Sequence, residues 1–301
     1  SSFTSAPVAA FGFLGPNPAS ISVDGSNLKS QFDQSMTLVG GNITVGPGKP
    51  VPGSDALKAP SIQGGQVYIA SLASPGEILV GTLSPTVNVI GRSPGALGTV
   101  QISKSSTIDT SESGGGAIHI RGGRLIVNGT NIFAKTGDIL LDGATISLND
   151  STWIVTFVDA NPGAKAGNIV ITASEGISMD SKAKVESQAS ASLNDAGNIT
   201  LRTSQGNITL SNEATIISGA FTGGRNTGSI EIDAQNGDVR LGNASLIFPS
   251  TDQDAGKMGD VKITANNLHI LDKSAIDSDN RSTQAAGNVD IQLKGLLRLT
   301  G

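Results

Sequence analysis

The sequence predicts an all-β protein, a right-handed parallel β-helix of roughly 10–12 coils that forms a single domain over residues 1–301. Three observations predict this fold class. A glycine-led unit recurs along the chain, apolar and polar residues alternate within each unit, and aromatic residues make up only 3% of the chain. A core of Ile, Val and Leu with so few aromatic anchors suits thin repeated layers better than a round globule.

The repeated unit opens with a glycine, which is followed by two aliphatic residues separated by one position, as in Gly197–Leu201 (GNITL). Successive copies are 21, 30, 30, 31, 31 and 28 residues apart. Self-similarity at a near-constant period is typical of stacked repeat architectures. The seven copies begin at Gly116, Gly137, Gly167, Gly197, Gly228, Gly259 and Gly287.

The first strand-like piece of each unit places its two aliphatic residues on one face, because side chains alternate along a strand. No single coil can hide its own apolar face, so we expect equivalent residues of successive coils to stack as continuous columns. The predicted core columns are Ile118 and Ile120, Ile139 and Leu141, Ile169 and Ile171, Ile199 and Leu201, Ile230 and Ile232, Val261 and Ile263, and Val289 and Ile291.

A second strand-like piece follows a bend, where glycines such as Gly143, Gly176, Gly206 and Gly237 are expected to supply a positive φ. A third, shorter piece closes the unit. Trp153 is interpreted there as a large core filler, with a sugar-stacking role as the alternative. The residues predicted to point inward from the third piece are Ile132, Trp153, Val185, Ile216, Leu246 and Ile276.

Residues 1–115 are less regular than residues 116–301, whose coils repeat at about 30 residues. Three segments of the first third match the first strand of the unit: Gly41–Val45, Gly65–Ile69 and Gly98–Ile102. Several prolines interrupt the intervals between them. We therefore expect the same helix here, with longer loops and a short hairpin.

Several segments of this first third also resemble a known family. Asn17–Val23 (NPASISV), Met36–Ile43 (MTLVGGNI), Ser71–Glu77 (SLASPGE) and Gly114–Gly123 (GGGAIHIRGG) follow one another in that order. The order is similar to that of bacterial two-partner-secretion exoproteins of the filamentous-haemagglutinin type, immediately downstream of their secretion domain. The resemblance covers most of the chain and is sharpest before Gly123.

The resemblance implies a right-handed β-helix that an outer-membrane two-partner-secretion transporter exports. It also implies an extracellular location, either attached to the bacterial cell surface or released from it. The NPNL and NPNG-I elements of the family's secretion domain do not occur in this sequence. We therefore expect the transporter-recognition segment to precede Ser1 and the chain to be a fragment of a longer protein.

No catalytic residue and no cofactor is predicted. Polysaccharide lyases and hydrolases share the fold, but their chemistry needs a carboxylate pair, or a calcium cluster with a basic residue, on adjacent coils. The sequence contains no paired aspartates accompanied by Gly-His-Gly. His119 and His269 lie between inward aliphatic residues, so exposed surface histidines are expected, with a general base as the alternative.

No metal site is predicted either. Asp252 and Asp254, with Asp260, come nearest to a calcium loop, but they lack a third side-chain ligand and a terminal Glu. We expect a solvated acidic loop there, and the same for Asp277 and Asp279. The absence of cysteine excludes disulfides and thiolate ligands. A net charge of −5 without a basic stripe argues against nucleic acid as a partner.

Asn168, Asn198 and Asn288 each follow a unit-opening glycine. A stacked amide ladder between coils and an ordinary turn preference are both open as explanations. The glycine-rich stretches Gly114–Gly116 and Gly223–Gly224 are interpreted as coil corners, because neither leads into a helix followed by Lys-Ser/Thr. Glycosylation acceptor triplets begin at Asn42, Asn128, Asn149, Asn198, Asn207, Asn243 and Asn280.

The expected function is that of a non-catalytic shaft or adhesin on the bacterial surface. Its loops or distal domains would attach to a host, cell or matrix ligand. Two alternatives belong to other classes. An open β-helix end exposes unpaired strand edges, which would allow end-to-end assembly into a filament. A polysaccharide-acting enzyme is the other alternative.

Overall fold

The computed structural model describes residues 10–31, 34–50, 56–79, 96–113, 115–159, 163–190, 194–221, 224–251, 256–280 and 285–301. These residues form 28 strands and a single 3₁₀ turn, η1 (Ser111–Ser113), with no α-helix among them. Apart from the antiparallel pair β1 (Ala10–Phe13) and β8 (Gly76–Leu79), the named strands pair in parallel. The prediction of an all-β chain built on parallel sheets is confirmed.

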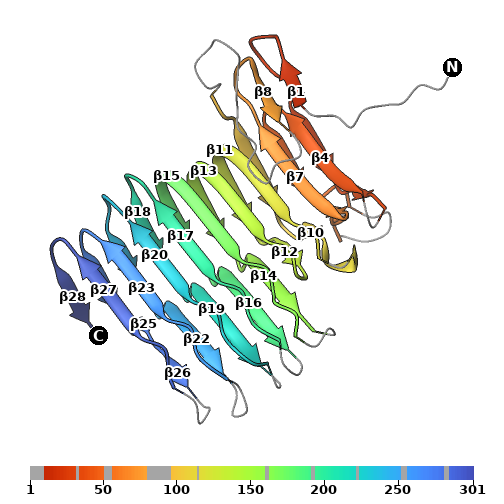
Figure 1. Cartoon of the computed structure of the whole chain (residues 1–301). Helices are drawn as coiled ribbons and strands as arrows, with labels where there is room; N and C mark the ends of the chain where they lie inside the picture. Colours follow the sequence, from red (N-terminus) through yellow and green to blue (C-terminus); the bar gives the residue numbers. More distant parts are fainter. Residues whose placement is uncertain are drawn as a thin grey trace.

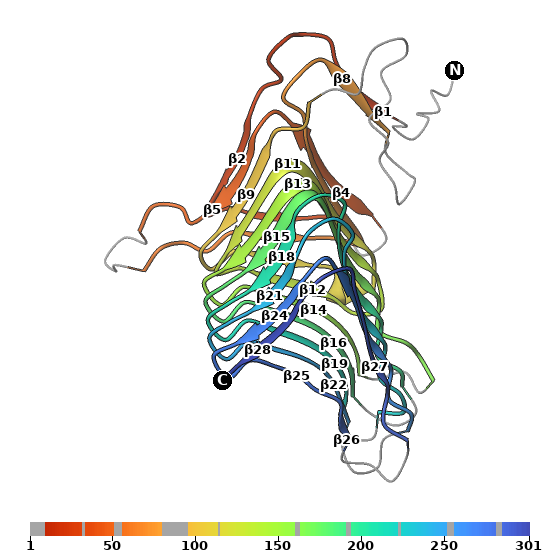
Figure 2. The same cartoon turned by 90° about the vertical axis from the view of Figure 1, so that its left-hand side faces the viewer.

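Successive strands along the chain do not pair with each other but with their equivalents one unit later, so the units stack as layers. The stack runs from the N-terminal to the C-terminal end (Figure 1), and the layers superpose in a three-sided outline (Figure 2). Strands β11 (Ile118–Asn128), β13 (Ile139–Asn149) and β15 (Ile169–Met179) each continue through the first bend and form two sides of their layer.

The 16-stranded sheet provides the first two sides of the outline and a ten-stranded sheet provides the third. On the first side lie β4 (Ser35–Gly40), β7 (Gln66–Ser71), β17 (Ile199–Thr203), β20 (Ile230–Ala234), β23 (Val261–Ala265) and β27 (Val289–Leu293). On the second side lie β2 (Ile21–Asp24), β5 (Ile43–Gly46), β9 (Thr99–Ser103), β18 (Asn207–Leu210), β21 (Val239–Leu241), β24 (Leu268–Leu271) and β28 (Leu297–Thr300). On the third lie β3 (Asn27–Lys29), β6 (Ser61–Gln63), β10 (Thr107–Asp109), β12 (Asn131–Ala134), β14 (Trp153–Val158), β16 (Lys184–Ser190), β19 (Thr215–Phe221), β22 (Leu246–Thr251), β25 (Ala275–Ile276) and β26 (Asp279–Asn280).

The aliphatic residues of the glycine-led unit meet their equivalents in the register of these sheets. Ile169 pairs with Ile199, and Leu201 pairs with Ile232. From Ile118 to Ile263, all twelve residues of the predicted columns are at most 1% exposed and belong to one continuous core. The last pair differs, because Val289 and Ile291 have a neighbouring strand on one side only and are 43% and 37% exposed.

The third strand is displaced by one residue from the prediction in two layers. Ile154, not Trp153, pairs with Ile132 and Val185 in the buried column, and Ile247, not Leu246, continues it. Trp153 and Leu246 therefore lie on the outward face, and the core-filler interpretation of Trp153 is wrong. Both layers carry two consecutive apolar residues at this point, so the sequence pattern alone does not distinguish the two registers.

The glycines at the first bend do not have the positive φ that the sequence predicts for them. Gly143, Gly176, Gly206 and Gly237 are all absent from the residues with positive φ. A Cβ on Gly237 would overlap the carbonyl of Gly206 in the layer before it. Unit-opening glycines stack in the same way, each against the carbonyl of its predecessor. Close approach between layers, and not backbone handedness, therefore excludes a side chain at Gly143, Gly206 and Gly237, whereas a Cβ on Gly176 would make only an ordinary contact.

Left-handed residues do occur, at the bend between the second and third strands. Asn212 and Glu213 have φ of 53° and 64°, and the equivalent pair Asn243 and Ala244 has φ of 53° and 61°. The N–H of Glu213 donates to the carbonyl of Asn243 at 2.9 Å. A left-handed non-glycine residue costs about 1–2 kcal/mol, and this hydrogen bond between layers offsets part of that cost.

The N-terminal third shares the stack but differs from its predicted assignment. Gly65–Ile69 contributes to β7 on the first side, as the pattern predicts, because Val67 pairs with Ile118. Gly41–Val45 and Gly98–Ile102 instead contribute to β5 and β9, which belong to the second side. The second strand can thus begin with the same glycine-led pattern as the first. Antiparallel pairing in this third joins β1 to β8, which are distant in the sequence, and isolated antiparallel bridges join Pro50 to Leu57 and Leu72 to Leu97.

Candidate functional site

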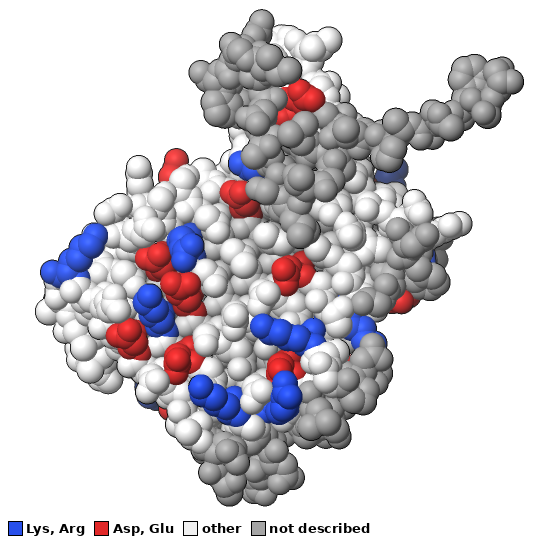
Figure 3. Space-filling view, in the orientation of Figure 1, with Lys and Arg blue, Asp and Glu red and all other residues white. Residues whose placement is uncertain are grey.

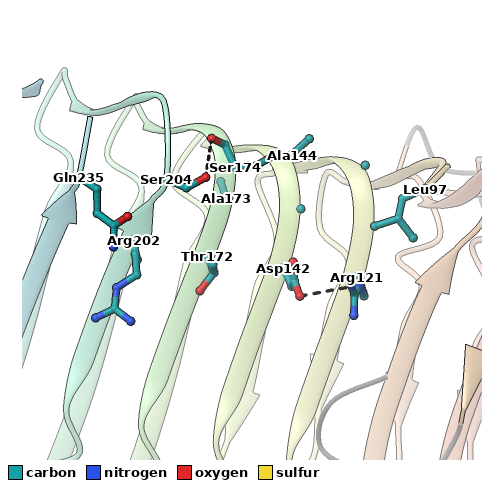
Figure 4. Close-up of a pocket in the computed structure, with 12 residues that line it drawn as sticks. Leu97, Arg121, Asp142, Ala144, Thr172, Ala173, Ser174, Arg202, Ser204 and Gln235 are labelled. Atoms are coloured by element: carbon teal, nitrogen blue, oxygen red, sulfur yellow. Dashed lines mark hydrogen bonds and ion pairs between the residues drawn. The ribbon is translucent and has the colours of Figure 1, made fainter. Parts of the chain in front are cut away.

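A groove of about 490 Å³ crosses the outer surface of the stack at the first bend (Figure 4). One polar row forms its wall: Arg121, Asp142, Thr172 and Arg202 occupy equivalent outward positions on successive strands. The row continues to Asp233 on β20. The groove is lined by Leu97, Arg121, Gly123, Asp142, Gly143, Ala144, Thr172, Ala173, Ser174, Arg202, Ser204 and Gln235.

The groove is hollow because small residues form its floor and a longer bend forms its rim. Gly143 and Ala144 leave space where other residues would project. Between Gly143 and Thr145 the register of β13 and β15 shifts, so that β15 carries one additional residue at the bend. Such bulges redirect the backbone of a strand. Ser204 then ties the rim together, because its hydroxyl donates to the carbonyl of Ser174 at 3.2 Å.

Opposite charges compensate one another along the polar row. Arg121 Nε lies 3.8 Å from Asp142 Oδ2. Arg202 is held more closely, with Nε 3.1 Å from Asp233 Oδ2 and Nη2 3.3 Å from Glu231 Oε2. Charges of both signs are likewise interspersed over the face of the molecule shown in Figure 3. The groove therefore presents hydrogen-bond donors and acceptors without a strong net field.

His119 is buried, which contradicts the expected exposed histidine. It points outward, as the alternation predicts, but it pairs in register with Tyr68 and Leu140 and is only 4% exposed. Its Nδ1 has no hydrogen-bond partner. Burial lowers the pKa of His119, with a smaller opposing effect from Asp142. The imidazole is therefore neutral at physiological pH and out of reach of a ligand in the groove.

His269 is partly covered and not fully exposed. Its side chain is 17% exposed, and Nε2 lies 3.9 Å from Asp238 Oδ2. The hydrogen bond from Arg240 lowers the pKa of Asp238, and Asn267 and His269 act in the same direction. These groups belong to the outer face of the second side, where they link adjacent layers rather than converge on a cavity.

Trp153 is part of a compact cluster on the outward face of the third side. Its indole Nε1 donates to Glu186 Oε2 at 3.1 Å, and Lys184 Nζ lies 2.6 Å from the same oxygen. Lys184 also lies 5.7 Å from the centre of the indole ring, and Phe133 packs edge-on against it with ring centres 5.4 Å apart. Oε2 of the buried Glu186 carboxylate thus has two partners, the indole N–H of Trp153 and the ammonium group of Lys184.

Asn168, Asn198 and Asn288 belong to a ladder that also includes Asp138, Ser229 and Asp260. The backbone N–H of Asn198 donates to Asn168 Oδ1 at 3.0 Å, and that of Ser229 donates to Asn198 Oδ1 at 2.9 Å. At the end of the stack, the N–H of Asn288 donates to Asp260 Oδ1 at 2.8 Å. From Asp138 to Asp260, each ladder side chain therefore accepts from the backbone of the next layer, which differs from an amide-to-amide stack.

The acidic residues considered as metal ligands are dispersed in the structure. Asp260 belongs to the ladder just described, Asp277 Oδ1 accepts from the N–H of Ser278, and Asp279 lies in β26. Asp252 and Asp254 lie outside the described residues. The described part of the chain contains no group of three potential metal ligands.

The two glycine-rich stretches lie at corners of the stack. Gly115 has a φ of 101°, and a Cβ on Gly116 would overlap the carbonyl of Gly65 in the preceding layer. Gly224 approaches the carbonyl of Ala189. Gly114 and Gly223 lie outside the described residues.

The sequence analysis did not identify the groove, although a signal for its polar wall exists. Each wall residue lies five positions after a unit-opening glycine, where Arg121, Asp142, Thr172 and Arg202 alternate in charge and polarity. The sequence contains no comparable signal for the floor and the rim of the groove, because their shape depends on a register shift between strands.

Comparisons with known proteins give no match: no family model, no curated protein and no solved structure is similar to this chain. Among the residues that the structure describes, no helix is long and apolar enough to cross a membrane.

Proposed function

We propose that this chain is part of the non-catalytic shaft of a secreted bacterial surface protein of the filamentous-haemagglutinin type. In this proposal it folds as a right-handed parallel β-helix of about ten coils, and an outer-membrane two-partner-secretion transporter exports it. The observation that supports the proposal best is the continuous parallel pairing from β11 to β27, in which equivalent strands of successive units pair directly.

A stack of this kind suits a shaft because each layer is stabilised mainly by its two neighbours. Length can then increase one unit at a time without a change in the core. Hydrogen bonds between layers add to the aliphatic columns, as in the ladder through Asn168 and Asn198. The same architecture leaves the outer face of the sheets and the connecting loops open to variation.

The groove also supports a binding role in preference to a catalytic one. Hydrolysis of a glycosidic bond uses two carboxyl groups that flank that bond. Here Asp142 and Asp233 are separated by the two strands β15 and β17, and each carboxylate faces an arginine. His119, the nearest imidazole in the sequence to the groove wall, is buried.

The shaft proposal is tested by shape and by export. At about 4.8 Å per layer, ten layers form a rod of about 45–50 Å, which small-angle scattering and negative-stain microscopy both measure. A compact, nearly spherical particle would contradict the β-helix. Production of the protein with and without the proposed transporter tests export, and protease-accessible protein on the cells is expected only when the transporter is present.

A second candidate function is end-to-end assembly, which requires that the stack of the whole protein end at β27 and β28. The last layer exposes the row Val289, Ile291, Leu296, Leu297 and Leu299, which are 37–63% exposed. Strands β27 and β28 each have a partner on one side only, so their backbone groups on the other side are available for pairing. Multi-angle light scattering over a concentration series tests this candidate. Growth that Ile291→Lys abolishes supports assembly, and a constant monomer mass contradicts it.

A further inference from the structure

We propose that the groove at the first bend binds a neutral polysaccharide, with the sugar chain lying along the stack and crossing several layers. This inference goes beyond the proposed shaft function, because it gives the shaft a ligand site of its own. The wall of this site consists of Arg121, Asp142, Thr172 and Arg202 (Figure 4). Its floor consists of Gly143, Ala144 and Ala173.

The shape of the groove fits an extended polymer. Its lining residues extend from Leu97 at one end to Gln235 on the other, across β11, β13, β15 and β17. Adjacent strands are about 4.8 Å apart, so a ligand lying along the groove meets one polar side chain of the wall at each step. Of the floor residues, Gly143 and Ala173 are buried, and the partly exposed methyl group of Ala144 is the apolar contact against which the C–H face of a sugar ring can pack.

The polar groups of the wall match hydroxyl groups in particular. A sugar hydroxyl both donates and accepts hydrogen bonds. The wall alternates a guanidinium, a carboxylate, a hydroxyl and a second guanidinium in successive layers. Asp142 remains 40% exposed and Arg202 remains 45% exposed, so both can form further bonds. Ser174, Ser204 and Gln235 supply additional donors and acceptors on the rim.

The charge balance argues against an acidic polymer. Two guanidinium groups, of Arg121 and Arg202, face three carboxylates, of Asp142, Glu231 and Asp233. The groove therefore has no excess positive charge to attract a polyuronate or a nucleic acid, both of which bind largely through uncompensated cations.

The sheet pairing argues against an extended peptide. A peptide strand adds to a sheet through free backbone groups at an edge. Strands β13, β15 and β17, which carry the wall, each pair on both sides. A peptide in the groove would find no backbone ladder to extend, whereas a sugar chain needs none.

Affinity electrophoresis of the full chain through gels containing hydroxyethyl cellulose, galactomannan or dextran tests the proposal, with polygalacturonate as the acidic comparison. We expect at least one neutral polymer to retard the chain, and we expect the retardation to persist in about 0.5 M NaCl, which screens exposed charges. Retardation by polygalacturonate alone, or by no polymer, would overturn the proposal.

Three variants locate the binding site. Ala144→Phe fills the floor and is expected to weaken binding at least about tenfold, and Thr172→Ala is expected to weaken it by a smaller factor because it removes one hydroxyl. Thr264→Phe is the matched control, because Thr264 follows Asp233 in the same outward row but does not line the groove. Circular dichroism establishes folding for each variant. If folded Ala144→Phe binds as the wild type does, the groove is not the site, and the shaft proposal stands independently of that result.

Discussion

The irregular N-terminal third and the last layer of the stack show opposite relations between motif and burial. Val67 and Ile69 lie between loops that interrupt the repeat, yet they are at most 1% exposed. Val289 and Ile291 belong to an intact copy of the glycine-led unit, yet they are more than one-third exposed. Strand β7 has β4 on one side and β11 on the other, whereas β27 has only β23. Neighbouring layers, and not the motif of the layer itself, determine how deeply an aliphatic residue is buried.

The largest effect is expected when a charge is introduced into the fully covered part of the stack. Leu201→Asp places an unpaired carboxylate in a column that is 0% exposed, between Ile171 and Ile232. We expect loss of cooperative folding, because an unpaired buried charge costs many kcal/mol. Urea denaturation followed by circular dichroism measures the effect. Ile291→Asp is the comparison at the exposed end, and equal damage from both variants would contradict the relation between neighbours and burial.

A smaller effect is expected from removal of aliphatic volume in the two regions. Ile69→Ala, in the irregular third, should lower the free energy of unfolding by about 2–5 kcal/mol, because the cavity lies in a close-packed column. Ile291→Ala should lower it by less than about 1 kcal/mol, since water already reaches this side chain. Chemical denaturation of both variants gives the difference directly. A larger loss of unfolding free energy for Ile291→Ala than for Ile69→Ala would show that an intact repeat motif matters more than burial between two neighbouring layers.

The ladder of side chains offers a finer form of the same comparison. Asn198→Ala removes the acceptor for the N–H of Ser229, and a cost of about 0.5–1.5 kcal/mol is expected. Asn288→Ala removes only the 3.2 Å bond from its Nδ2 to Asp260 Oδ1, so a smaller cost is expected. Thermal unfolding under identical conditions ranks the two variants. Equal melting temperatures would show that the ladder contributes little to stability.

The smallest effect concerns ion pairs between layers and their dependence on pH. The hydrogen bond from Arg225 lowers the pKa of Asp195, although partial burial opposes it. A carboxylate with a lowered pKa stabilises the fold above its ordinary pKa of about 4, and this stabilisation is lost as the pH falls through the lowered value.

Denaturation of Asp195→Asn across this acid range should show a weaker dependence on pH than the wild type. Glu112→Gln is the control, because the pair of Lys29 and Glu112 at 2.7 Å is about half exposed on both sides and exposed pairs contribute little. If the stability of Asp195→Asn falls in acid as steeply as that of the wild type, the pair of Arg225 and Asp195 is not a source of the pH dependence.

The pattern of the sequence predicts the parallel stack and the alternation of the first two strands, because those features repeat at fixed offsets from a glycine. It does not predict the register of the third strand, where Trp153 and Ile154 are both apolar and only pairing with Val185 decides between them. It also does not predict the left-handed bends, since pairs such as Asn212 and Glu213 contain no glycine and depend on hydrogen bonds to the next layer.

By itself, the sequence determined that this protein forms layers of short parallel strands around columns of aliphatic residues, because period-two alternation and a repeated glycine are local properties of each unit. Only the tertiary structure decided which outward residues become buried, as His119 does, and where the surface is hollow. The groove lies where small residues, Gly143 and Ala144, meet a bend of β15 that is one residue longer than that of β13. A difference in bend length between two layers shapes the surface only when the layers are stacked, so it cannot be recognised in the sequence of one unit.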